Sequence, residues 1–257
     1  AVPGDTRTTE LSYLTNAALH LVDRVKTRAV RAGGAPGAGA VVRESHFAYD
    51  GDTSGVAPPT IGDLTSRTDA LYDVTMPDPT TTFGYDVYGN LTSVTDPRAN
   101  AGSGGGTTTT EYDATYHSFP TALVNALGHR SEISYTPPPG CAVAHSAGEG
   151  LVGQQRGPND LAASTSWARC YDVFGRMVSE AAPGGLAWAT WSHVDTPLAV
   201  ATIESRKSSA TSMRVATTHY DGLGRAVSSE HTGPGGQTVA DVSFAYDAVG
   251  RVVATTQ

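Results

Sequence analysis

The side chains that most often carry chemistry are present in this 257-residue chain, but their spacing matches no catalytic or metal-binding pattern. The eight histidines form no His-x3-His or Glu-x2-His pair and the cysteines no Cys-x2-Cys pair, the local arrangements that zinc sites normally show. No Gly-x-Ser-x-Gly segment is present to expose a serine nucleophile. The glycine-rich stretches 33–39 and 102–106 lack the Lys-Ser/Thr step of a phosphate-binding loop. We therefore predict no enzyme activity, no metal site and no cofactor.

The two cysteines, Cys141 and Cys170, flank segment 136–166. A disulfide that closes this segment fits an exported protein. Two small buried thiols fit the sequence as well, because free cysteine packs like a small hydrophobic residue. We favour the two-thiol interpretation and keep the disulfide as the alternative. In neither case is Cys170 expected to be a nucleophile, because it precedes Tyr171 on an expected strand.

Aspartates recur in a fixed pattern, Tyr-Asp-x-x-Gly-Arg/Asn-apolar, and a fifth, degenerate copy has Asn in the place of Asp. Internal repeats indicate architecture before chemistry. Here Asp opens a type I turn and Gly supplies the left-handed residue that brings the second strand back. The pattern residues are Tyr85, Asp86, Gly89, Asn90; Asn125, Gly128; Tyr171, Asp172, Gly175, Arg176; Tyr220, Asp221, Gly224, Arg225; and Tyr246, Asp247, Gly250, Arg251.

This turn geometry predicts which side chains face each other. Asp should lie opposite the residue after Gly, so that Asp172 meets Arg176. One position further out, on the other face, Tyr171 should meet Met177 as an aromatic–aliphatic cross-strand pair. The carboxylates are therefore expected to hold turns, not to catalyse.

The composition fits the strands that such turns must connect. The chain has 29 glycines and 15 prolines and only 16% charged residues, which favours short strands and turns over helices. Residues 10–31 are ambiguous, because their apolar residues fit a helical stripe nearly as well as alternation. A turn at 33–37 followed by a valine-rich run favours strands there. We predict an all-β fold of successive antiparallel β-hairpins.

The repeat resembles the YD repeat of the Rhs family, which occurs in bacterial Rhs proteins, in Tc insecticidal toxin components and in animal teneurins. Residues 83–98, 110–120 and 125–129 look most like the B component of Tc toxin complexes, and the resemblance extends upstream through 21–25 and 46–51. Segment 136–166 departs from it and is expected to be an atypical insertion loop. The resemblance implies a curved, spirally wound sheet and one continuous unit over residues 1–257, part of a larger parent protein.

In that family the sheet encloses a toxic polypeptide, which implies that this chain is a wall segment of such a shell, without catalysis of its own. The family's self-cleaving Asp-Pro-x-Gly-Leu signature is missing here, since neither Asp78-Pro79 nor Asp96-Pro97 continues to Gly-Leu. The alternative is an extracellular adhesion, carbohydrate-binding or self-assembling surface protein, as teneurin-type repeats suggest.

Each interpretation implies partners and a location. We expect other segments or copies of the same sheet as partners, with an enclosed toxin polypeptide or a glycan as further ones. A net charge of −8 argues against nucleic acid, which needs a clustered basic surface. No apolar run reaches the roughly 18 residues of a transmembrane helix. The predicted location is secreted or at the cell surface.

Overall fold

The structure is a computed structural model that describes residues 6–72, 75–185, 188–196, 199–207, 213–233 and 237–256. The chain divides into two units, residues 1–130 and residues 131–257, which are described here one at a time. The predicted continuity of 1–257 as one unit stays a prediction.

The first unit is a series of antiparallel strands, each paired with the next along the chain. In sequence order its elements are β1 (Arg7–Asn16), η1 (Ala17–Leu19), β2 (Leu21–Ala32), β3 (Val41–Tyr49), β4 (Leu64–Ala70), β5 (Thr80–Tyr85), β6 (Leu91–Thr95), α1 (Pro97–Asn100), β7 (Thr107–Tyr112) and β8 (Pro120–Val124).

The ambiguous segment 10–31 is extended, as predicted. β1 and β2 form a long hairpin that the short helical turn η1 connects, with His20 in the left-handed conformation at its end. The sequence predicts a turn only at 33–37, so the break at 17–19 was not predicted. The two strands pair from Arg7–Ala32 to Asn16–Leu21, so that tertiary pairing outweighs the helical stripe.

The second unit continues the same pattern of antiparallel neighbours. Its elements are β9 (Arg130–Ser134), η2 (Ala147–Glu149), β10 (Gln154–Arg156), α2 (Pro158–Ala162), β11 (Trp167–Tyr171), β12 (Met177–Ala181), η3 (Pro183–Gly185), β13 (Trp188–Thr196), β14 (Ala199–Lys207), β15 (Met213–Tyr220), β16 (Ala226–Thr232), β17 (Thr238–Tyr246) and β18 (Val252–Thr256). The all-β prediction is confirmed for both units.

Segment 136–166 is not a loop throughout. It contains β10, which pairs with β9 on one side and with β11 on the other, so the ladder of strands runs through it. The short helix α2 connects β10 to β11. A three-residue strand has too few residues to show alternation, which is why the sequence did not reveal it.

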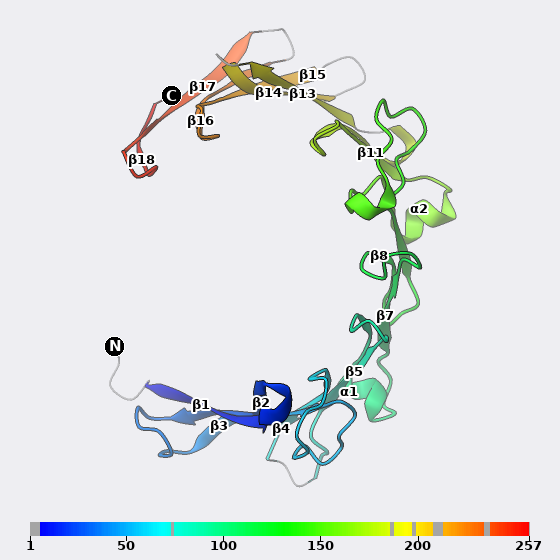
Figure 1. The fold of residues 1–257 in the computed structure, drawn as a ribbon, viewed down its shortest axis with the longest axis vertical. Coiled ribbons are helices and arrows are strands. Elements are labelled where there is room, and N and C mark those ends of the chain that lie inside the picture. Colours follow the sequence, from blue (N-terminus) through cyan, green and yellow to red (C-terminus); the bar gives the residue numbers. More distant parts are fainter. Residues whose placement is uncertain are drawn as a thin grey trace. The chain divides into compact units, whose positions relative to one another are not determined.

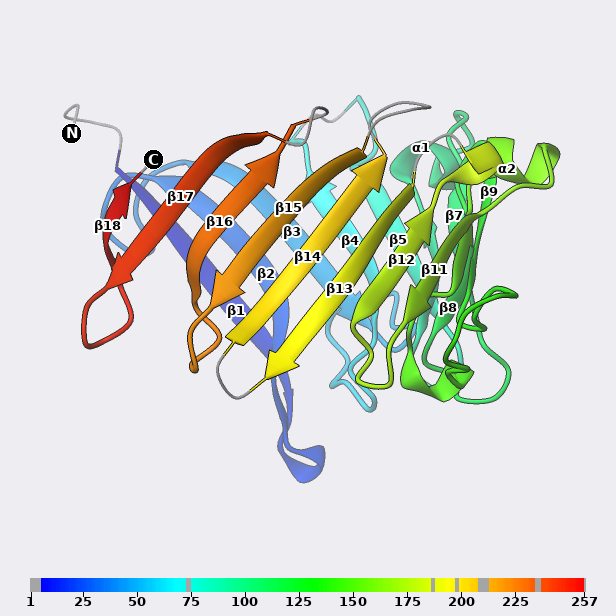
Figure 2. The same ribbon diagram turned by 90° about the horizontal axis from the view of Figure 1, so that it is seen from above.

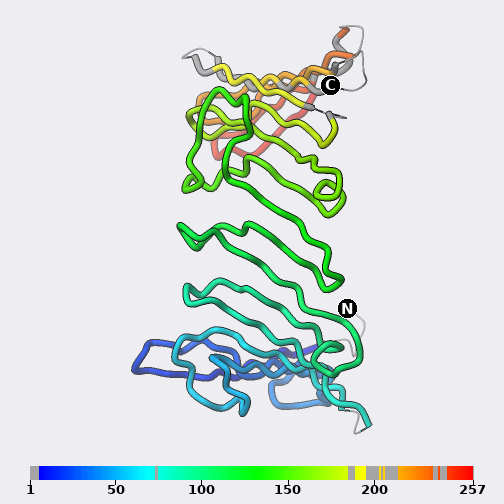
Figure 3. The backbone as a smooth tube through the Cα atoms, turned by 90° about the vertical axis from the view of Figure 1, so that its right-hand side faces the viewer, coloured from blue at the N-terminus to red at the C-terminus, as the bar shows by residue number. Residues whose placement is uncertain are grey.

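Within each unit the strands lie side by side in one layer, as the labelled strands of Figure 1 and the row β13–β17 of Figure 2 show. The tube in Figure 3 follows the chain back and forth from one hairpin to the next. Because one layer encloses little, few of the described residues are buried. The buried apolar residues are Leu14, Ala29, Ala48, Tyr49, Pro59, Ala122, Ala182 and Ala189. None of the helices in the described ranges has the length and apolarity that a membrane crossing needs.

Cys141 and Cys170 form a disulfide in the structure, with their Cα atoms 5.4 Å apart. The bond fastens the start of segment 136–166 to β11. The favoured interpretation, two free thiols, is therefore wrong in this structure, and the alternative holds. Spacing alone did not show that the two residues meet.

This disulfide leads to a first prediction. Thiol titration of the unreduced, unfolded protein should detect no free cysteine. The Cys141→Ser/Cys170→Ser double variant should lose about 2–4 kcal/mol of unfolding free energy, the usual effect of opening a loop of this length. Two titratable thiols, or a double variant as stable as the parent, would contradict the bond.

Candidate functional site

Every repeat tip of the sequence pattern forms the same turn. The amide of Gly89 donates to the carbonyl of Asp86, and the amide of Asp86 donates to the carbonyl of Asn90. The tips at Asn125, Asp172, Asp221 and Asp247 show the same pair of bonds. Gly89, Gly128, Gly175, Gly224 and Gly250 all have φ between +75° and +86°, the left-handed region expected of them.

The aspartate side chain holds the turn together. In Asp172, Oδ1 accepts the amides of Phe174 and Arg176 at 2.9 and 3.0 Å, while Oδ2 accepts Nε of Arg176 at 2.7 Å. Asp221 and Asp247 show the same arrangement: Oδ1 accepts two turn amides, and Oδ2 accepts Nε of Arg225 or Arg251. Asp86 does so through the side-chain amide of Asn90. These bonds lower the pKa of all four carboxyls.

The degenerate tip works by the same geometry without a charge. Asn125 Oδ1 accepts the amides of Leu127 and His129 at 2.9 and 3.0 Å. Its Nδ2 lies 3.3 Å from Nδ1 of His129, which takes the place of the arginine. An amide oxygen is therefore sufficient for the turn.

Two further tips were missed as turn-holding sites in the sequence analysis, although the Tyr-Asp dipeptide marks them. Asp50, after Tyr49, accepts the amides of Thr60, Ile61, Gly62 and Asp63. Burial raises the pKa of Asp50, but these amides lower it further, so the net shift is downward.

Asp113, after Tyr112, accepts four amides of the loop that leads to β8. They depress the pKa of Asp113 strongly, against the opposing effect of burial. In both tips the same dipeptide organises a longer loop than the YD turn.

The tyrosine of the pattern connects one hairpin to the preceding one. The hydroxyl of Tyr246 donates to the carbonyl of Ala226 at 2.7 Å, and that of Tyr112 to the carbonyl of Leu91 at 3.2 Å. Both acceptors directly follow the turn of the preceding repeat. The hydroxyls of Tyr49 and Tyr171 also donate to backbone carbonyls, those of Val25 and Val152, each at 2.9 Å, although these acceptors do not directly follow a repeat turn.

On β13, where the tip lacks a tyrosine, Nε2 of His193 donates to the carbonyl of Met177 at 2.9 Å. Met177 again directly follows a repeat turn. The sequence analysis assigned the tyrosines only a contact within their own hairpin. That pair is also present, since Tyr171 faces Met177 and Tyr246 faces Val252.

The residue after the turn glycine also reaches the next hairpin. Nδ2 of Asn90 donates to the carbonyl of His117 at 2.6 Å. The guanidinium of Arg225 lies over the ring of Tyr246, 4.7 Å from its centroid. Together with the tyrosine bonds, these contacts join several repeat tips to a neighbouring hairpin.

The tips share one further feature, and at one of them it contacts the arginine of the same tip, since the guanidinium of Arg176 lies 5.2 Å from the centroid of the Phe174 ring. The residue before the turn glycine is apolar or aromatic in every copy, and its side chain is exposed. These residues are Tyr88, Leu127, Phe174, Leu223 and Val249. The sequence carried this signal in the second variable position of the pattern, which the sequence analysis left unused.

Segment 136–166 is also attached to a repeat tip through His145, whose side chain is only 5% exposed. Its Nε2 donates to the carbonyl of Asp172 at 2.8 Å, and its Nδ1 binds the carboxylate of Glu149. The bond to Glu149 raises the pKa of His145. Together with the disulfide, this histidine fastens the segment to the sheet.

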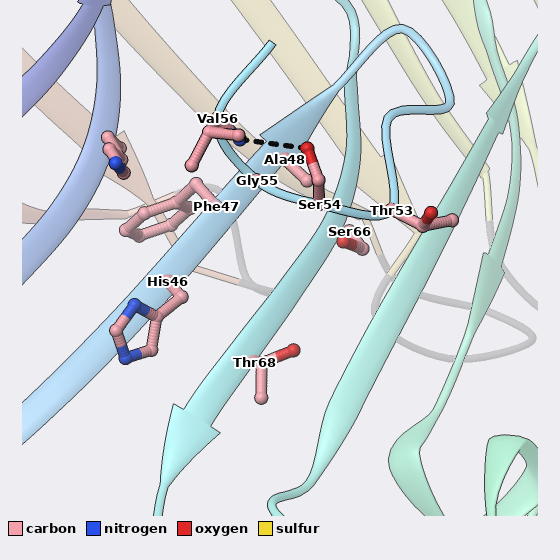
Figure 4. A pocket seen from close by; sticks show the side chains of 10 residues that line it. His46, Phe47, Ala48, Thr53, Ser54, Gly55, Val56, Ser66 and Thr68 are labelled. Carbon is pink, nitrogen blue, oxygen red and sulfur yellow. Dashed lines mark hydrogen bonds between the residues drawn. The ribbon is translucent and has the colours of Figure 1, made fainter.

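The loop after Asp50 covers a cavity of about 290 Å³. Asp52 orders the near part of the loop, where the hydroxyl and amide of Ser54 and the amide of Ala57 lower the pKa of Asp52 to about 2. Figure 4 shows the side chains around the cavity, which include the hydroxyls of Ser66 and Thr68 and the rings of His46 and Phe47. In the loop, the amide of Val56 donates to the hydroxyl of Ser54. Across the described residues, no three His, Cys, Asp or Glu side chains lie close enough to hold a metal ion.

Residues 220–257 match the RHS repeat family. This stretch includes the last two YD tips. The match agrees with the predicted Rhs-type YD repeat over this part of the chain. No curated protein matches the chain by sequence.

The chain is similar to several solved structures of Tc toxin components. A crystal structure of TcdB2-TccC3 without its hypervariable C-terminal region has 13% identity and a TM-score of 0.43, over 96% of this chain and 15% of that one. A second TcdB2-TccC3 structure has 13% identity and a TM-score of 0.40, over 94% and 15%. The Photorhabdus luminescens Tc holotoxin pore has 11% identity and a TM-score of 0.21, over 97% and 21%. The chain thus spans about 15% of the length of the first two.

The turn geometry predicts that the glycine matters more than the ion pair beside it. Gly175→Val should cost roughly 1–3 kcal/mol of unfolding free energy, because a β-branched residue is strained at positive φ. An added Cβ would meet no atom closer than 3.6 Å, so that the loss reports the backbone and not a clash. Arg176→Ala should cost less, because the pair is partly exposed. Equal losses in chemical denaturation would show that the turn is assigned wrongly.

The bond between hairpins predicts that Tyr246→Phe loses about 0.5–1.5 kcal/mol, the net value of one hydrogen bond. The matched control is Tyr116→Phe, since the hydroxyl of Tyr116 has no hydrogen bond to any described residue and its side chain is exposed. Thermal unfolding of both variants would test this. If the two variants have the same melting temperature, the Tyr246 bond does not stabilise the contact between the hairpins.

The lowered aspartate pKa values predict a loss of stability in acid. A carboxyl with a depressed pKa stabilises the fold above its unfolded value of about 3.9, and this contribution disappears as pH falls through the folded value. Melting temperature should therefore begin to drop below about pH 4 and continue through the titration of Asp52, whose pKa is about 2.

Asp52→Ala should remove part of that acid-dependent drop. Asp23→Asn should leave it unchanged, because Asp23 bonds only Arg24 and no backbone amide. A melting temperature that stays flat across this range would contradict the role of the carboxylates.

Proposed function

We propose that this chain is a wall segment of a shell that encloses a toxin or effector polypeptide, and that it has no catalytic activity of its own. The observation that carries the proposal is the bond from the hydroxyls of Tyr112 and Tyr246 to the carbonyl after the preceding turn. Because contacts of this kind recur between neighbouring hairpins, the sheet can extend by repetition, as repeat proteins do.

The single layer supports the same role. Few described residues are buried, so the sheet does not surround an interior site of its own. A wall needs this property, because one of its faces contacts the cargo and the other contacts the surroundings. In this proposal the sheet is curved and spirally wound, the protein is secreted or displayed at the cell surface, and its partners are neighbouring segments of the wall and the cargo polypeptide.

A second candidate function is glycan binding at a cell surface. The cavity of Figure 4 favours it, because hydroxyl groups and an aromatic ring around a small cavity suit the hydrogen-bonding and apolar faces of a sugar. No charge or metal is required for that role.

Protease protection of the native gene product that contains these residues would test the shell. We expect a polypeptide that resists trypsin in the intact protein and becomes digestible in the Gly250→Val variant, whose turn is strained. Arg251→Ala should keep the protection, because the side chain of Arg251 is 80% exposed.

The absence of any protected polypeptide would overturn the shell proposal. Specific binding on a glycan array, lost in Thr68→Val, would then favour the second candidate.

A further inference from the structure

Three arginines gather around one cavity in the first unit, away from the repeat tips. The cavity has a volume of about 280 Å³ and is lined by Arg28 and Val30 of β2, Arg43, Ser45 and Phe47 of β3, and Arg67 of β4. The strand register brings them together, since Arg28 faces Ser45, Val30 faces Arg43 and Phe47 faces Arg67. Directly paired residues share a face of a sheet, so that the three guanidinium groups belong to the same face.

One of these charges is already neutralised. Nη2 of Arg67 lies 2.8 Å from Oδ1 of Asp69, and the hydroxyl of Ser45, only 4% exposed as a residue, donates to the same oxygen. Burial opposes ionisation of Asp69, yet the bonds from Ser45 and Arg67 lower its pKa, so it is charged at neutral pH. This pair fixes Arg67 at the edge of the cavity.

The other two arginines of the cavity are Arg28 and Arg43. Within the described residues, Arg28 and Arg43 make no hydrogen bond or ion pair, and both are exposed. Asp69 also attracts Arg43 through space, since Arg43 helps to lower the pKa of Asp69. The three arginines that line the cavity thus share one carboxylate, in a chain whose net charge is −8. A planar guanidinium binds tetrahedral and carboxylate oxyanions through paired N–H groups, which a lysine cannot match.

We propose that this cavity binds a small ligand through a phosphate or sulfate group, held by Arg28 and Arg43. Arg67 borders the site in the position that Asp69 and Ser45 set. The volume lies near the lower end of ligand cavities, which suits one or two such groups and excludes a large molecule. The proposal is independent of the shell function, because it rests on residues outside the repeat tips.

Isothermal titration with sodium pyrophosphate and, separately, sodium sulfate at constant ionic strength would test the site. We expect one-to-one binding of at least one of them, and the preferred anion indicates whether the natural ligand is phosphorylated or sulfated. Arg28→Gln and Arg43→Gln should each weaken binding by about tenfold, the usual range for a charge-assisted bond. Arg43→Lys should also weaken it, because the charge remains but the fork is lost.

Arg7→Gln is the matched control. It removes the same charge from an exposed position on β1 that does not line the cavity, so its affinity should stay within about twofold of the parent. All variants should keep the parent's circular dichroism and melting temperature, since the replaced side chains are exposed. The proposal is overturned if neither anion binds, or if Arg7→Gln weakens binding as much as Arg43→Gln.

Discussion

The bond between an aspartate carboxylate and the amides of its own loop is the interaction on which the rest of this structure depends. A single-layer sheet buries too little apolar surface to specify its register by packing, so each hairpin must set its register locally. The carboxylate does this by satisfying turn amides that a short loop would otherwise leave to solvent. With the tip closed, the strands on either side have one possible pairing, and Asp faces Arg or Asn in every intact repeat.

The tyrosine converts a set of hairpins into a continuous sheet. The hydroxyls of Tyr112 and Tyr246 each reach the carbonyl of the residue that follows the one whose carbonyl closes the preceding turn. Burial raises the pKa of Tyr49 and of Tyr171, so both hydroxyls stay protonated and able to donate. Asp and Tyr therefore have separate tasks, one within the hairpin and one between hairpins, which explains why they occur together at the end of a strand.

The sequence predicted what is local and missed what depends on neighbours. The turns at Gly89 and Gly175 follow from the residues within a few positions of each glycine, and they form as expected. The bond from Tyr246 to Ala226 depends on the alignment of two hairpins, which no short pattern contains. For the same reason the Cys141–Cys170 bond was only the less favoured alternative, and the strand β10 was not predicted, since each depends on a partner distant along the chain. The arginine cavity likewise arises from the register of three strands.

The same closing bond serves loops of very different lengths. The amide of the aspartate donates to the carbonyl of the residue just before the returning strand, from Asp86 to Asn90, from Asp113 to Phe119 and from Asp50 to Asp63. The chain between these points can lengthen while the junction with the sheet stays constant, because the carboxylate accepts whichever amides the longer loop presents. Loop closure itself costs little extra as length grows. The strands can therefore keep a repetitive wall while individual tips acquire cavities, such as the one beneath residues 53–56, without disturbing the neighbouring repeats.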